Sequence, residues 1–87
     1  MYIMSTSAVE IVPRASAIEC TDQDLVVLLD DGRRLSAPLT WFPRLLAATP
    51  VQRAQWRLIG GGEGIRWDRL DEDLSVRGLL RGDKAVR

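Results

Sequence analysis

Residues 24–39 have the sequence DLVVLLDDGRRLSAPL, which carries the clearest structural signal in the chain. The run DLVVLL is apolar and contains β-branched valines, which favours a strand, and RRLSA can form the returning strand. Between them, Asp31–Gly32 suits a primed hairpin turn, because glycine accepts the positive φ that this turn requires. The stretch therefore predicts a β-hairpin, and we expect it at the centre of the fold.

Two further strands are expected before this hairpin. The segments AVEIVPR (residues 8–14) and SAIECT (residues 16–21) alternate between apolar and polar side chains well enough to form strands. Pro13 marks an edge or a bend, because proline cannot donate to a strand ladder.

Short helices are expected after the hairpin, where prolines punctuate the chain. We place one at residues 41–48 and a second at residues 50–57. The second has the form of a capping box, in which Thr49 caps the helix and the Gln52 side chain reaches back to the Thr49 amide. Proline at the first helical position agrees with this start.

The C-terminal part predicts one more strand and one more helix. In GIRWDRL, Ile65 and Trp67 would point to one face of a strand and Arg66 to the other. The segment DEDLSVRGLLRG (residues 71–82) predicts a turn and then a short helix. Its Ser75 is the expected N-cap, and its last glycine occupies the C-terminal cap position.

These segments together predict one α+β domain. We expect a small antiparallel sheet of three to five strands, built around the central hairpin, with two or three short helices on one face. The domain should span residues 8–82, with flexible tails at residues 1–7 and 83–87. The predicted core contains Val9, Ile11, Ile18, Val26, Leu28, Leu35, Trp41, Leu45, Leu58, Ile65, Leu79 and Leu80.

The composition excludes several classes of site. Among 87 residues there are 12 basic and 12 acidic side chains and no histidine, so neither a Ser-His-Asp triad nor a histidine zinc site can form. The single Cys20 cannot form an internal disulfide, and we expect it to be a small buried hydrophobe. We see no signal peptide and no apolar run of about 20 residues, so we expect a cytoplasmic protein without a membrane span.

The glycine-rich segment WRLIGGGEGIRW (residues 56–67) matches neither phosphate-binding pattern that we considered. No lysine follows it as in a Walker loop, and the glycines do not link a strand to a long helix as in a dinucleotide fold. Glu63 would also repel an anion. We therefore expect a structural role, with a positive φ at one or more of its four glycines and a close approach to a neighbouring element or a partner.

Two charged clusters are candidate sites. Asp71, Glu72 and Asp73 could hold a divalent cation, although acidic residues before a helix also stabilise its N-terminus. Residues 41–67 hold four arginines against one carboxylate and interleave them with aromatic residues. On a continuous helix, Arg53 and Arg57 would share one face, which suits an acidic partner or nucleic acid, or simply amphipathic packing.

Residues 30–80 carry a resemblance to a known family. The motifs DGR, PLTWFPRL, AT, QR, GGGEGIRW and LDEDLSVRGLL closely resemble the bacterial family Domain of Unknown Function 2442 (DUF2442). The resemblance implies a small α+β fold and no particular reaction. In some relatives the module is fused to a helix-turn-helix domain. Many are encoded beside Domain of Unknown Function 4160 (DUF4160), similar to a toxin–antitoxin pair.

The sequence thus favours a non-enzymatic protein-binding or regulatory module, and the resemblance implies that it is an antitoxin-like partner of a small, DUF4160-like neighbouring protein. One alternative is nucleic-acid binding through Arg44, Arg53 and Arg57, and another is a metal-dependent hydrolase or nuclease that uses the acidic triplet. Pairing of the basic helix with that triplet between copies would give a homodimer. We expect no cofactor and no metal. The candidate partner-binding residues are Trp41, Arg44, Arg53, Trp56, Arg57, Gly61, Gly62, Glu63, Trp67, Asp71 and Asp73.

Overall fold

A computed structural model describes residues 12–85 of the chain. Its strands are β1 (Ala15–Cys20), β2 (Asp24–Leu29), β3 (Arg34–Pro38), β4 (Arg57–Ile59), β5 (Gly64–Trp67) and β6 (Glu72–Ser75). Its α-helices are α1 (Pro43–Leu46), α2 (Pro50–Arg53) and α3 (Val76–Arg81). Short 3₁₀ turns lie at Leu39–Trp41 (η2), Gly60–Gly62 (η3) and Asp68–Leu70 (η4).

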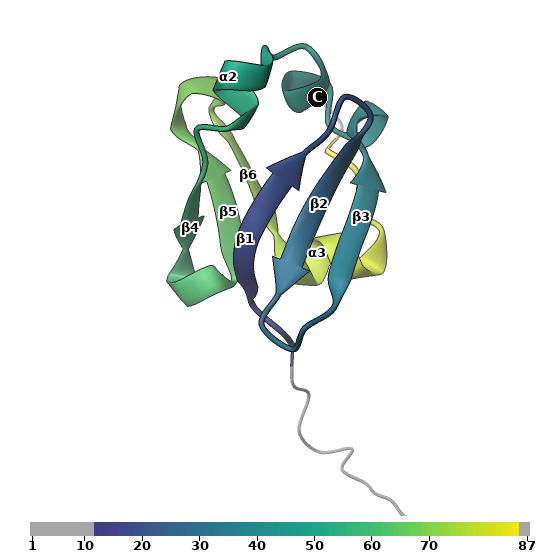
Figure 1. Ribbon diagram of the computed structural model, residues 1–87, viewed down its shortest axis with the longest axis vertical. Helices are drawn as coiled ribbons and strands as arrows, with labels where there is room; N and C mark the ends of the chain where they lie inside the picture. Colours follow the sequence, from purple (N-terminus) through teal and green to yellow (C-terminus); the bar gives the residue numbers. More distant parts are fainter. Residues whose placement is uncertain (1–11, 86–87) are drawn as a thin grey trace, which may run out of the picture.

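The strands form two antiparallel sheets of three strands each, in the orders β1-β2-β3 (sheet A) and β4-β5-β6 (sheet B). Figure 1 shows sheet A in front, with α2 at the upper end of the molecule and α3 behind sheet A. The predicted α+β class and the β2–β3 hairpin are therefore confirmed. The strands are divided between two sheets because β4 pairs with β5 instead of extending the β1–β3 sheet.

One hydrophobic core lies between the elements and draws on both sheets. Sheet A contributes Ala15, Ile18, Leu25, Val27, Leu29 and Ala37, and sheet B contributes Ile65 and Trp67. The segment after β3 adds Leu39, Phe42 and Leu45, and α3 adds Val76 and Leu79. Because the two sheets share these contacts, residues 12–85 pack as one unit.

Four predicted core residues, Ile18, Leu45, Ile65 and Leu79, are buried as expected. Leu35, Trp41 and Leu58 are partly buried and pack against the core. The predictions for Val26, Leu28 and Leu80 are wrong, because the first two are half-buried on the outward face of β2 and Leu80 is 43% exposed on α3. Val9 and Ile11 lie outside the described residues.

The error in β2 has a simple cause. An uninterrupted apolar run has no alternation to show which residues face inward, and a shift of one residue exchanges the two faces of a strand. In the structure Leu25, Val27 and Leu29 face the core.

The hairpin turn also differs from the prediction. A primed turn at Asp31–Gly32 requires a positive φ at Asp31, its first central residue, but among Asp30–Arg33 only Gly32 has a positive φ (93°). The Gly32 amide donates to the Leu29 carbonyl (3.1 Å), and the Asp31 carboxylate accepts a hydrogen bond from the Arg33 amide (3.0 Å) on the other side of the glycine.

The second helix is shorter than predicted. It ends at Arg53, and residues 57–59 form β4, because Arg57, Leu58 and Ile59 pair in register with β5. The capping box is confirmed, with Thr49 Oγ1 accepting from the Gln52 amide (3.1 Å) and Gln52 Oε1 accepting from the Thr49 amide (2.9 Å).

The C-terminal segment contains a strand that the sequence did not indicate. Residues 72–75, expected as part of a turn, form β6 against β5. The cap predictions are confirmed, because Ser75 Oγ accepts from the Gly78 amide (2.9 Å) and Gly82 ends α3 with a φ of 86°. Beyond α3, the Ala85 amide donates to the Trp41 carbonyl (3.1 Å). The domain boundaries proposed from the sequence stay predictions.

At the other end of the chain, residues 12–14 precede β1 and are not part of a strand. The predicted strand at residues 8–14 is therefore wrong for these three positions, and its first four residues lie outside the described part of the chain.

Candidate functional site

The glycine-rich segment forms the hairpin that joins β4 to β5. Gly60, Gly61 and Gly62 have φ values of 60°, 66° and 100°, which confirms the expected positive φ, whereas Gly64 is not among the positive-φ residues. A Cβ atom on Gly62 would lie 2.6 Å from the Ala15 carbonyl oxygen. The run therefore lets the start of β1 pack directly against the turn.

Gly64 creates a second feature, on the outward face of sheet B. A Cβ atom there would lie 3.0 Å from Ile59 Cγ1, so the Ile59 side chain lies across the glycine. A shallow hollow of about 240 Å³ opens beside it, lined by Ile59, Gly60, Glu63, Gly64, Asp73, Leu74 and Ser75. We call it the Gly64 hollow.

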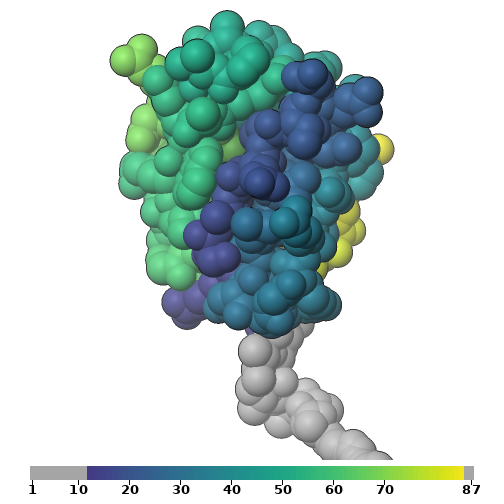
Figure 2. Space-filling model, viewed as in Figure 1, coloured from purple at the N-terminus to yellow at the C-terminus, as the bar shows by residue number. Residues whose placement is uncertain are grey.

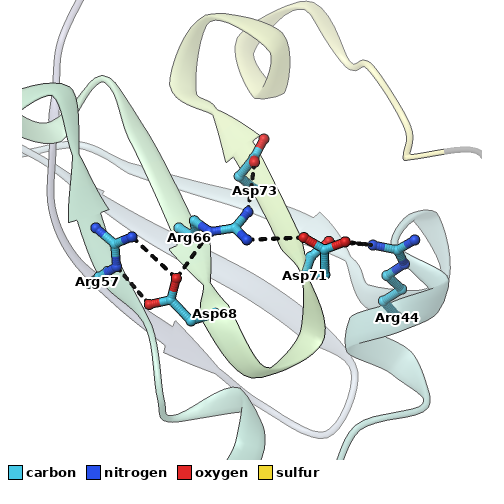
Figure 3. Close-up of polar contacts among 6 residues, drawn as sticks. All are labelled: Arg44, Arg57, Arg66, Asp68, Asp71 and Asp73. Atoms are coloured by element: carbon cyan, nitrogen blue, oxygen red, sulfur yellow. Dashed lines mark hydrogen bonds and ion pairs between the residues drawn. The ribbon is translucent and has the colours of Figure 1, made fainter.

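Arg66 organises the charged side chains beside this hollow. Its Nε donates to Asp68 Oδ1 (3.1 Å), its Nη2 to Asp71 Oδ1 (3.0 Å) and its Nη1 to Asp73 Oδ2 (3.0 Å). Figure 3 shows the three carboxylates arranged around this one guanidinium. Because a planar guanidinium has fixed donor directions, these contacts hold the aspartates in defined positions.

Further arginines continue the network at both ends (Figure 3). Arg57 donates to both oxygens of Asp68, from Nε at 2.7 Å and from Nη2 at 3.2 Å. Arg44 Nη1 lies 3.7 Å from Asp71 Oδ2 and also donates to the Asp71 carbonyl oxygen. We call this set of three arginines and three aspartates the ion-pair face: Arg44, Arg57, Arg66, Asp68, Asp71 and Asp73.

Strand register creates most of the ion-pair face. Arg57, Arg66 and Asp73 are direct neighbours across β4, β5 and β6. Their side chains point outward because Ile65 and Trp67, on either side of Arg66 in the chain, are buried.

The contacts shift the pKa values of Asp68 and of the arginines Arg57 and Arg66. The hydrogen bond from Arg57 is the main cause that holds the pKa of Asp68 below its ordinary value. The bonds to Asp71 and then Asp68 raise the pKa of Arg66. The ion-pair face joins three arginines to three aspartates, so its formal charges balance.

The acidic triplet does not converge on one point. Asp71 and Asp73 both contact Arg66, whereas Glu72 is fully buried at the β6 position opposite Trp67. Successive residues of a strand point to opposite faces, which separates Glu72 from Asp73. No group of three or more potential metal ligands occurs within residues 12–85.

Arg53 does not share a face with Arg57, because α2 ends between them. Its Nε donates to the Leu45 carbonyl (2.8 Å) and its Nη2 to the Leu46 carbonyl (2.9 Å), so it satisfies the last carbonyls of α1. Trp67 is fully buried and donates from Nε1 to the Arg53 carbonyl (3.0 Å). The contacts of Arg53 and Trp67 are therefore within the fold, and they stabilise it.

Trp56 and Cys20 line a different hollow, of about 390 Å³, between β1 and α2. Both residues are partly buried and pack against the core. Desolvation raises the pKa of the Cys20 thiol, with a smaller opposing effect of Arg53. A raised thiol pKa agrees with the expected packing role of this cysteine.

The remaining sequence candidates lie away from the ion-pair face. Trp41 is half-buried and lies under Lys84, whose Nζ is 5.2 Å from the ring centroid. Gly61 and Glu63 are exposed in the glycine turn, where Glu63 Oε2 lies 3.8 Å from Arg14 Nη2. Of the eleven candidates, the structure brings Arg44, Arg57, Asp71 and Asp73 together on one surface.

A family model described as "Protein of unknown function (DUF2442)" matches residues 15–85, from the first residue of β1 to the last described residue. The chain belongs to the DUF2442 family. The resemblance found in residues 30–80 is thus confirmed, and the match also includes the first strand. The family description assigns no activity.

Two solved structures are similar to this DUF2442 member. One is a crystal structure of a protein of unknown function from Rhodospirillum rubrum, with 28% identity, a TM-score of 0.73, and coverage of 86% of this chain and 93% of that one. The other is a solution NMR structure of an uncharacterized protein from Chromobacterium violaceum, with 24% identity, a TM-score of 0.72, and coverage of 84% and 69%. No curated protein matches the chain significantly.

Across the described residues of this DUF2442 member, no helix is long and apolar enough to cross a lipid bilayer.

Sequence reasoning did not include Arg66 and Asp68 among the candidate residues. The sequence places Arg66 on the outward face of its strand, and this placement is the available signal. Its three carboxylate partners depend on the turn at Asp68–Leu70 and on β6, which the sequence did not indicate.

Proposed function

We propose that this DUF2442 protein is a cytoplasmic, non-enzymatic protein-binding module, the antitoxin-like or regulatory half of a pair, and that its partner contacts the outward face of sheet B. One observation carries the proposal. On this face, a shallow apolar hollow at Gly64 lies directly beside a fixed network of alternating charges, and Asp73 belongs to both.

This combination suits protein recognition. Interfaces join an apolar centre to a polar rim, and arginine is among the residue types that contribute most to binding. The ion pairs within the network hold its side chains in place before a partner arrives, so less side-chain entropy is lost on binding. An apolar side chain of the partner would occupy the Gly64 hollow, and its charged groups would pair with exposed members such as Asp71 and Arg57.

The charge balance favours a protein over a polyphosphate as the partner. Nucleic-acid binding draws on uncompensated positive charge. Here Asp71 and Asp68 compensate Arg44 and Arg57, and Arg53 binds backbone carbonyls. Arg66 forms ion pairs with Asp71 and Asp73, whose carboxylates would otherwise be available to a divalent cation.

The test is direct binding to the product of the adjacent gene, for which a DUF4160-like protein is the first choice. The two purified proteins are titrated by calorimetry, with the parent chain and with the double variant Arg57→Glu, Asp71→Arg. These side chains are 58% and 80% exposed. Because Asp71 has a φ of 50°, which Asp adopts more readily than Arg, circular dichroism of the double variant checks that its fold is intact. Arg53 is not used, because its guanidinium supports α1.

We expect the double variant to weaken the complex by more than ~2 kcal/mol, about 30-fold in the dissociation constant. The matched control is Asp31→Arg with Arg33→Glu, which reverses an exposed ion pair (2.8 Å) in the β2–β3 turn and should bind like the parent. Equal affinity of the double variant and the parent would exclude this face. The absence of any complex would exclude the adjacent gene product as the partner.

A further inference from the structure

The outward face of sheet A carries aliphatic side chains that no helix of the described chain covers. Val26 and Leu28 lie on this face of the central strand, and Ala17 pairs with Leu28 from β1. Figure 1 shows this sheet in front of α3, with α2 above it, and Figure 2 shows the same face filled by side chains of β1, β2 and β3. We call Ala17, Val26 and Leu28 the aliphatic strip.

An ion pair crosses this strip. Glu19 on β1 is the neighbour of Val26, and Arg34 on β3 is the neighbour of Leu28. Glu19 Oε1 and Arg34 Nη1 lie 3.6 Å apart, so the two side chains meet over the central strand. The arginine side chain is 67% exposed and the glutamate side chain 59%, so both can exchange partners without a movement of the backbone.

This arrangement is self-complementary. A two-fold axis parallel to β2, halfway between two such faces, would place β1 of one copy over β3 of the other. Glu19 of each copy would then lie opposite β3 of the other copy, two residues along from Arg34 and within reach of its long side chain, which gives two ion pairs between the copies. The aliphatic strips would meet at the centre, at the spacing of about 10 Å at which sheets pack.

We propose that the outward face of sheet A is the interface of a symmetric homodimer, with a second copy of this chain as its occupant. The face uses none of the residues assigned to the sheet B surface, so the proposal does not depend on the proposed function. The homodimer suggested from the sequence relied on Arg53 and Arg57 with the acidic cluster. The sheet A proposal uses a different pair of charges, Glu19 and Arg34, whose intramolecular ion pair can be exchanged for the same contact with a second copy.

The experiment uses two charge reversals and their mixture. Sedimentation velocity is measured over a dilution series for the parent, for Glu19→Arg and for Arg34→Glu. In a Glu19→Arg dimer arginines would face arginines, and in an Arg34→Glu dimer glutamates would face glutamates. Each variant alone should raise the dimer dissociation constant by about tenfold or more.

An equimolar mixture of the two variants should recover dimers. The introduced arginine of one variant faces the introduced glutamate of the other, and the two unchanged side chains also form a pair of opposite charge. This recovery separates an interface from a defect in the monomer fold, which mixing cannot repair.

Two further variants complete the design. Arg81→Glu disrupts an exposed ion pair with Asp83 (2.8 Å) on α3 and should dimerise like the parent. Val26→Lys places a charge in the aliphatic strip and should dissociate the dimer without altering either ion-pair residue. A parent that is monomeric throughout the series, or a dimer that neither reversal weakens, would overturn the proposal. Failure of the mixture to recover dimers would also overturn the proposal.

Discussion

At the scale of single residues, Gly62 is the position where the backbone has least freedom to accept a side chain. It combines a φ of 100° with a Cβ position 2.6 Å from the Ala15 carbonyl oxygen. Gly82 has a similar φ of 86°, but nothing lies within 4 Å of its Cβ position. Comparing the same substitution at the two glycines therefore separates the cost of backbone strain from the cost of steric contact.

We expect Gly62→Ala to lower the free energy of unfolding by about 2–4 kcal/mol, because strain and overpacking add. Gly82→Ala should cost about 1–2 kcal/mol, from strain alone. Urea denaturation followed by circular dichroism measures both. Equal losses would mean that the contact with β1 is not what requires glycine at position 62.

Residue-scale features with local causes could be predicted from the sequence. The capping box at Thr49, the Ser75 cap and the positive φ in the glycine run depend on neighbours within a few positions. Arg66 shows the opposite case. Its bonds to Asp71 and Asp73 depend on the register of β5 and β6, which is set by the packing of buried side chains on the other face.

At the scale of elements, β2 shows what an apolar run can and cannot specify. The run predicted a strand correctly, but five consecutive aliphatic residues contain no signal for the direction of each side chain. Only the packing of the strand against sheet B and the helices shows that Leu25, Val27 and Leu29 face inward.

This assignment predicts unequal effects of the same substitution in one strand. Leu25 is fully buried, so Leu25→Ala should lower the free energy of unfolding by about 2–5 kcal/mol. Leu28 is half-buried on the outward face, so Leu28→Ala should cost only about 1 kcal/mol. Chemical denaturation at low protein concentration, where association through sheet A adds little, gives both values. A larger loss of unfolding free energy for Leu28→Ala than for Leu25→Ala would show that the inward and outward faces of β2 are assigned the wrong way round.

The short elements after β3 were harder to predict, because each depends on contacts from elsewhere in the chain. Helix α2 is only four residues long, and Arg53, its last residue, bonds to carbonyls of α1. Strand β4 has three residues and exists because β5 supplies its hydrogen bonds. The local sequence predicts a helix that continues to Arg57, but the pairing of β4 with β5 overrides this local preference.

At the scale of the whole molecule, two small sheets are held together by one core on the inside and by ion pairs on the outside. The core cluster joins both sheets and α3, and Trp67 is its largest fully buried side chain. Outside, the ion-pair face ties β4, β5 and the η4 turn to α1 through Arg44. The described chain should therefore unfold as one cooperative unit, with an electrostatic contribution that depends on pH.

The direction of that pH dependence follows from Asp68. Hydrogen bonds from Arg57 and Arg66 hold its pKa in the folded state below the ordinary value. The folded protein thus binds this proton less tightly than the unfolded chain does. The resulting stabilisation is fully present above the unfolded carboxyl pKa of about 4, and it is lost as pH falls through the lower folded pKa. Asp31, whose pKa is lowered by Arg33, acts in the same direction.

We therefore expect Asp68→Asn to be less stable than the parent near neutral pH and to approach the stability of the parent in strong acid, where Asp68 is protonated in both states. Denaturation curves between about pH 7 and pH 2 measure this convergence. Asp22→Asn removes an exposed turn carboxylate outside the ion-pair face and is the matched control for the loss of one carboxylate. Because the Arg57–Asp68 pair is exposed to solvent, high salt should also reduce the difference between Asp68→Asn and the parent at neutral pH. A difference that persists unchanged at low pH would show that the amide alters packing instead of charge, and the network would then contribute through geometry alone.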